Sequence, residues 1–176
     1  GWSNVVTQVH QAGGKIIPQL WHVGAARKAG SLPNIDSPPV SPSGFTLKGK
    51  ENEKIKALTK KEVTEMIDSY AEAALNAMRL GFDGIELHGA HGYLIDQFFW
   101  DVTNKRKDEY GGDIGDRTKF AADIVRACRK EVGPDFPIVF RYSQWKGTDY
   151  GAKLANNSNE LDQLLAPLVD AGVDIF

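Results

Sequence analysis

Two histidines and a tyrosine stand close together near the middle of the chain, at His88, His91 and Tyr93. Two imidazole N–H groups aimed at one point could hold and polarise a carbonyl or phenolate oxygen, and a phenol beside them could deliver a proton near neutral pH. The same imidazoles could instead ligate a metal ion with Glu86 as a third ligand, or they could be inert. Spacing alone leaves these three interpretations open.

Three short apolar runs are typical of β-strands, at 15–21, 84–88 and 137–142. Each run carries polar or aromatic side chains at its carboxyl end, which are Gln19 and Trp21, Glu86 and His88, and Arg141 and Ser143. Burying a polar group without a partner is costly. We therefore expect Gln19 and Arg141 to face a ligand, and Glu86 to be a hydrogen-bonded carboxylate rather than a catalyst.

A helical pattern that ends at glycine precedes each of these strands. The predicted helices span 4–12, 59–80 and 116–132, and a fourth begins after Asn157 and leads to a further strand at 173–176. Thr59 and Glu62 have the spacing of a capping box, as do Asn157 and Glu160. Pro167 predicts a kink or an early end in the fourth helix.

A repeated unit of helix, glycine and strand predicts that the strands run parallel. A doubly wound sheet and a barrel both fit, but polar residues gathered at one set of strand ends favour the barrel, and no Gly-x-Gly-x-x-Gly run follows a strand. We predict an α/β fold of the (β/α)8 TIM-barrel type, with about strands 3–6 of the eight present. Residues 1–176 would form a single partial barrel domain, with a long loop excursion at about 23–58 and a small hairpin near 46–55.

Composition excludes several classes of protein. The formal net charge of -2 gives no basic surface for nucleic acid. No apolar run approaches the roughly 20 residues that cross a membrane, and the chain opens without a signal peptide or an initiator methionine. Cys128 is the single cysteine, which excludes an intramolecular disulfide and an iron–sulfur cluster held by several thiolates and favours a reducing, cytoplasmic setting.

Longer motifs resemble a known family. The stretch His88-Gly89-Ala90-His91-Gly92-Tyr93-Leu94, followed by Gln97-Phe98-Phe99, Asn104-Lys105-Arg106, Asp108-Glu109-Tyr110-Gly111-Gly112 and Asp116-Arg117, closely resembles the signature of the Old Yellow Enzyme family. Gln19-Leu20-Trp21-His22-Val23-Gly24 resembles the end of that family's third strand, and Phe140-Arg141-Tyr142-Ser143 resembles its fifth. The matches come in the family's order and span almost the whole chain.

The resemblance implies an FMN-dependent barrel that reduces activated alkenes, α,β-unsaturated carbonyls, with NADH or NADPH. His88 and His91 would bind the carbonyl oxygen of this small-molecule substrate. Tyr93 would donate a proton to the alkene carbon beside that carbonyl, and Trp21 would shape the pocket.

The resemblance also implies the cofactor contacts. Gln19 would hydrogen-bond the flavin ring, Arg141 would lie near its N1 and C2 oxygen, and His88 would contact it as well. The family's phosphate-binding segments have no counterpart here, so we expect the isolated chain to bind FMN weakly.

The sequence departs from the family pattern at three places, of which one is Phe99-Trp100 where Leu-Ser is more usual. Ala25 and Ala26 come before Arg27, so Arg27 receives no role. Ser143 is followed by Gln144 and Trp145 instead of the usual proline. These changes alter the walls of the predicted pocket.

Two alternative functions stay open. One is a metal-dependent barrel hydrolase or lyase that uses His88, His91 and Glu86, and the other is a non-catalytic half-barrel module. Whatever its function, a partial barrel would leave strand edges at 15–21 and 173–176 unpaired and barrel-interior residues such as Ile17, Ile85, Leu87 and Val139 without cover. This predicts that the chain can form a homo-oligomer.

Overall fold

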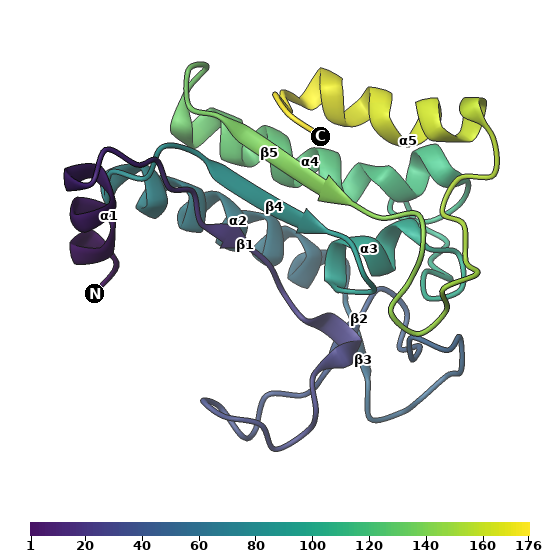
Figure 1. Cartoon of the computed structure of the whole chain (residues 1–176). Helices are drawn as coiled ribbons and strands as arrows, with labels where there is room; N and C mark the ends of the chain where they lie inside the picture. Colours follow the sequence, from purple (N-terminus) through teal and green to yellow (C-terminus); the bar gives the residue numbers. More distant parts are fainter.

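The computed structural model describes residues 1–176 and has its main elements in one sheet and a row of helices (Figure 1). In chain order the elements are α1 (Trp2–Gln11), β1 (Gln19–Leu20), the 3-10 helix η1 (Gly24–Ala26), β2 (Val40–Ser41), β3 (Lys56–Ala57), α2 (Lys60–Arg79), β4 (Ile85–Gly89), α3 (Leu94–Phe99), α4 (Ile114–Val132), β5 (Ile138–Tyr142) and α5 (Ser158–Ala171).

The main sheet is parallel, in the order β1, β4, β5. Ile175 extends it with a parallel bridge to Val139, so the predicted parallel order of the four strands is confirmed. Helices α2, α4 and α5 pack against their neighbours in sequence order, α2 against α4 and α4 against α5, along one face of the sheet (Figure 1). A doubly wound sheet carries helices on both faces, whereas barrel strands carry them outside only.

The core lies between the sheet and this row of helices. Ile85, Leu87, Ile138 and Phe140 are fully buried in a cluster of 31 residues. The expectation that Ile85 and Leu87 face the barrel interior is therefore wrong. Alternate residues of a strand point to opposite faces, and in β4 the apolar set faces the helices while Glu86 and His88 face the other way.

Strand β1 is shorter than the predicted 15–21. Pro18 has no N–H to donate, and the Ile16 N–H bonds the Asp83 carboxylate at 2.9 Å instead of a neighbouring strand. The carbonyls of Ile16 and Pro18 still accept from Asp83 and Glu86 at 3.0 and 2.9 Å. The segment thus lies beside β4, although only Gln19 and Leu20 complete the regular ladder.

Side-chain caps fix where the helices begin. Thr59 and Glu62 form the predicted capping box of α2. Helix α4 begins at Ile114, two positions before the predicted start at 116, because Asp113 caps it by accepting the Asp116 N–H.

The last helix, α5, departs from the prediction at both ends. Asn157 accepts the Glu160 N–H at 2.9 Å, but the Glu160 carboxylate takes the N–H of Asn156 instead of completing a box with Asn157. Pro167 lies inside the helix, which continues to Ala171. The predicted early end is therefore wrong.

Residues 23–58 extend beyond the carboxyl end of β1 (Figure 1). They hold η1 and the paired strands β2 and β3. The predicted hairpin is present, since Phe45 bridges Glu51 in antiparallel fashion and the Thr46 N–H bonds the Lys50 carbonyl.

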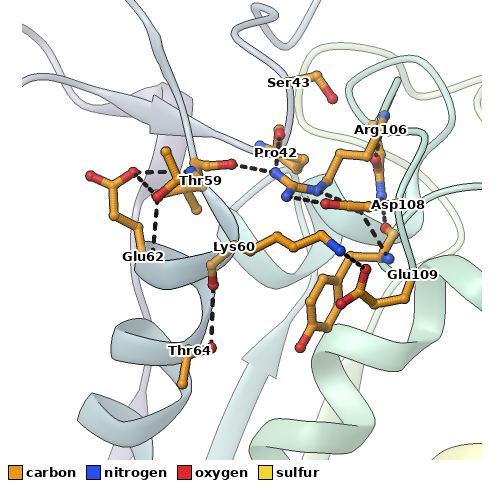
Figure 2. A network of polar contacts seen from close by, with 12 residues as sticks. Pro42, Ser43, Thr59, Lys60, Glu62, Thr64, Arg106, Asp108 and Glu109 are labelled. Carbon is orange, nitrogen blue, oxygen red and sulfur yellow. Dashed lines mark hydrogen bonds and ion pairs between the residues drawn. The ribbon is translucent and has the colours of Figure 1, made fainter.

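Arg106 ties this loop to the loop that precedes α4 (Figure 2). Its side chain is only 8% exposed and pairs with Asp108 at 2.6 Å. It also donates to the carbonyls of Pro42, at 2.8 Å, and Leu58. One guanidinium therefore joins the residues that directly follow β2 and β3 to residues 106–108.

None of the helices is both long and apolar enough to cross a membrane.

Candidate active site

One cavity of about 290 Å³ lies at the carboxyl ends of the strands. Its lining consists of the six residues singled out from the sequence, which are Gln19, Trp21, His88, His91, Tyr93 and Arg141. The predicted convergence on one end of the sheet is thus observed. The chemical roles of the six residues stay predictions.

Strand register explains how residues from three strands meet. Gln19 pairs with Glu86 across β1 and β4, and His88 pairs with Arg141 across β4 and β5. Because every second residue of a strand faces the same side, Gln19, Glu86, His88 and Arg141 share the face that the helices leave free. The carboxyl ends of parallel strands meet at one edge, so this face delivers its polar groups to a single place.

The loop after β4 brings in His91 and Tyr93. A Cβ on Gly89 would lie 2.6 Å from the Phe140 ring, so a larger residue there would push the buried ring of Phe140 aside. His91 then adopts φ +62°, and it is the only residue other than glycine with a positive φ. This turn folds the chain back, so that His91 and Tyr93 lie beside His88.

The aromatic rings of the site are in mutual contact. The Tyr93 ring lies 5.2 Å from that of His88 and 4.6 Å from that of Trp21, centroid to centroid. The rings of His88 and His91 are 5.4 Å apart. Trp21 is 49% exposed and stands edge-on to Tyr93, so it forms an outer wall of the cavity.

Both histidines of the site favour their neutral form. Burial is the main cause that lowers the pKa of His88, and the charges of His91 and Arg141 lower it further against an opposing effect of Glu86. Burial, Arg141 and Lys146 lower the pKa of His91. A neutral imidazole carries one N–H and one acceptor nitrogen. At pH 7 each ring can therefore donate one hydrogen bond without bringing a charge.

Arg141 and Gln19 differ in how their polar atoms are used. The Arg141 side chain makes no hydrogen bond or ion pair within the chain, and it lines the cavity. Gln19 donates from its amide nitrogen to the Glu86 carboxylate. Glu86 is thus held by a neighbour, as expected of a structural carboxylate.

The metal hypothesis lacks a ligand set. No group of three or more His, Cys, Asp or Glu side chains is arranged to hold a metal ion. Glu86, the third ligand that this hypothesis needs, is bonded to Gln19.

Two contacts to His91 were not predicted from the sequence. The His91 N–H donates to Ser143 Oγ at 3.0 Å, and the Trp145 ring stacks on the imidazole with centroids 4.8 Å apart. One signal for these two contacts is present in the sequence. A polar and aromatic Ser-Gln-Trp follows β5 where residues at a strand's carboxyl end face the site.

A parallel sheet with helices on one face and a polar cavity at the carboxyl ends of its strands defines an arc of a (β/α)8 barrel. The family model for the NADH:flavin oxidoreductase / NADH oxidase family matches residues 1–173, so the chain belongs to that family. This confirms the resemblance seen in the motifs around His88.

Relatives with curated descriptions include a plant reductase and a bacterial oxidase. The chain is 41% identical over 143 residues to 12-oxophytodienoate reductase 2 of Arabidopsis thaliana. The matched region is 76% of this chain and 38% of that reductase. It is 37% identical to NADH oxidase of Thermoanaerobacter brockii over 176 residues, which are 26% of the oxidase. The chain therefore spans well under half the length of these relatives.

Solved structures of morphinone reductase have the same fold. One superposes with a TM-score of 0.84 at 30% identity, covering 98% of this chain and 49% of the other. A morphinone reductase in complex with tetrahydroNAD matches equally well, with 51% of that chain covered. The chain thus corresponds to about half of a barrel, which confirms the predicted fold class.

Proposed function

We propose that this chain carries the substrate-binding part of an FMN-dependent enzyme that reduces α,β-unsaturated carbonyls with NADH or NADPH. The observation that carries the proposal is the single cavity shared by His88, His91, Tyr93, Gln19 and Arg141. The family match and the relatives named reductases and oxidases support the same class of reaction. In this proposal residues 1–176 act as one partial barrel domain in the cytoplasm, with no nucleic-acid or membrane partner.

The residues at the strand ends fit a flavin. Arg141 offers an unpaired guanidinium that could meet negative charge on a ring oxygen or nitrogen. Gln19 stands across the sheet from it and offers an amide that can donate and accept. His88 lies between them on β4, and its Nδ1 is buried without a partner. FMN, when bound, supplies the electron pair and the hydrogen that the alkene takes up.

The substrate carbonyl is held by the two histidines in this proposal. The neutral rings of His88 and His91 each direct one N–H at the oxygen, which polarises the conjugated alkene. A neutral donor suits this task, because it strengthens its hydrogen bond as charge develops on the oxygen. The histidine pair thus binds the substrate and activates it with the same contacts.

The proton comes from Tyr93. Its ring contacts both His88 and Trp21, which keeps the phenol beside the bound carbonyl. The hydroxyl delivers a proton to the carbon next to that carbonyl, and solvent restores it afterwards. Trp21 packs against the apolar part of the substrate. With bound FMN supplying a hydride, this proton would complete the addition of two hydrogens across the double bond.

Titration with FMN tests the cofactor assignment. Arg141→Gln removes one charge-assisted hydrogen bond, worth about 1.5–3 kcal/mol. We expect its Kd for FMN to be roughly 10–100-fold higher than that of the unchanged protein. Arg126→Gln, on the exposed face of α4 at 52% exposure, is the matched control and should leave the Kd unchanged. Equal affinities in all three proteins would place the flavin away from Arg141. If neither the 176-residue chain nor a longer protein that contains it binds FMN, a non-catalytic half-barrel module would be favoured.

A further inference from the structure

Lys146 and Asp96 form an ion pair whose side chains are both fully buried, with Nζ and Oδ1 2.5 Å apart. Neither residue lines the candidate active site. The second Asp96 oxygen accepts the N–H of Gly92 at 2.6 Å. A buried ion pair is weak evidence for stability, and its best-attested use is to fix one arrangement of the chain. This pair fixes Gly92, the residue after His91, to the segment that follows β5.

Two neighbours of Lys146 hold His91 itself. Ser143 Oγ accepts the His91 N–H at 3.0 Å and donates to the Trp145 carbonyl at 2.8 Å. The Trp145 ring stacks on the imidazole with 28° between the planes. Backbone and ring of one histidine are therefore both held by the same four-residue segment, 143–146.

His91 needs such support. Its φ of +62° is a conformation that residues with a Cβ rarely adopt. A backbone in such a region persists only where its surroundings hold it. Ser143 and Trp145 contact His91 directly, and Lys146 acts on Gly92 through Asp96, so all three bear on the two residues whose backbone makes the turn.

We propose that Ser143, Trp145 and Lys146 are positioning residues that aim the His91 ring at the oxygen bound beside His88. The effect of these residues on substrate binding rests on the proposed function, whereas their effect on His91 rests on geometry alone. It also gives a role to Gln144-Trp145, where the sequence departs from the family pattern. These residues supply the stacking ring and lead to the buried lysine.

A double-mutant cycle separates positioning from direct contact with substrate. Trp145→Ala is expected to raise the KM for 2-cyclohexenone about tenfold in the full FMN-loaded protein, within the range seen for coupled neighbours. Trp145→Phe keeps a ring and should restore most of the loss. In a His91→Ala background, Trp145→Ala should change KM by less than about twofold, because the ring that it positions is gone.

The Lys146 contact needs a variant that does not strand a buried charge. Asp96→Asn/Lys146→Met removes both charges together and keeps similar volumes. This double variant should fold and should have a higher KM for 2-cyclohexenone than the unchanged protein. In the His91→Ala background the same double change should leave KM unaltered. Trp2→Ala, an exposed tryptophan on α1, is the matched control and should leave KM unchanged.

Nuclear magnetic resonance of the 176-residue chain gives a readout without flavin or turnover. We expect a nuclear Overhauser effect between the rings of His88 and His91 that is lost in Trp145→Ala, and slow exchange of the His91 amide that becomes fast in Ser143→Ala. If these signals behave as expected but the FMN-loaded unchanged protein does not turn over the enone, the proposed function is rejected and the positioning inference still holds. Rings that stay in contact in Trp145→Ala, or equal effects of Trp145→Ala with and without His91, would overturn the positioning inference.

Discussion

The ring of His88 lies 5.4 Å from that of His91, at 69° between the planes, and the pKa values of both imidazoles are lowered chiefly by burial. Because the folded state resists protonation at His88, the unfolded chain binds more protons as the pH falls through the ordinary value of 6.5. The free energy of unfolding should therefore decrease between pH 7.5 and 5.5. His88→Asn removes this contribution and should show a shallower decrease in urea unfolding measured at both pH values. An identical pH dependence in the two proteins would contradict the lowered pKa.

Tyr93→Phe should slow alkene reduction and spare the reduction of flavin by NADH or NADPH. Protonation of the alkene belongs to the oxidative half-reaction alone. The rate of alkene reduction should therefore fall by about 10²–10⁴-fold, the usual contribution of a general acid, while the rate of flavin reduction stays the same. Stopped-flow absorbance of the flavin measures each half-reaction by itself. Equal losses in both halves would assign Tyr93 a structural role.

Arg106→Met should destabilise the fold strongly. It leaves Asp108 without its partner and the carbonyls of Pro42 and Leu58 without a donor (Figure 2), for a loss of about 3 kcal/mol in urea unfolding. Lys60→Met breaks the exposed pair with Glu109 and is the matched control, with an expected change below about 1 kcal/mol. A similar small change in both variants would show that the Arg106 contacts do not hold the loop.

Much of the fold could be predicted from the sequence, because its signals are local. Thr59 and Glu62 are three residues apart and satisfy each other's free groups, so the start of α2 could be predicted from the sequence. The convergence of Gln19, His88 and Arg141 followed from parallel strands, whose carboxyl ends meet at one edge.

The errors come from contacts between distant residues. The Ile16 N–H bonds the Asp83 carboxylate, which lies 67 positions away, and this shortens β1. The orientation of Ile85 and Leu87 depends on which face the helices cover, and the apolar run alone does not specify it. The contacts of Ser143 and Trp145 with His91 likewise form only when β4 and β5 lie side by side.

The isolated 176-residue chain should self-associate. Strand β1 is an edge of the sheet, and its outer N–H and C=O groups invite another strand. The face beside it is polar at Gln19 and Arg141, so edge pairing rather than apolar burial should drive the contact. Light scattering at rising concentration should show a homo-oligomer, and a monomer at all concentrations would contradict this expectation.

Turnover of a simple enone tests the central claim most directly. Protein loaded with FMN is mixed with NADPH or NADH and 2-cyclohexenone without oxygen, and cyclohexanone is measured for the unchanged protein and for His91→Ala. We predict that the unchanged protein forms the saturated ketone and that His91→Ala lowers kcat/KM by about 10²-fold or more, as the loss of one donor to a developing oxyanion does. Formation of cyclohexanone at the same rate in both proteins, or none from the FMN-loaded unchanged protein, would contradict the account.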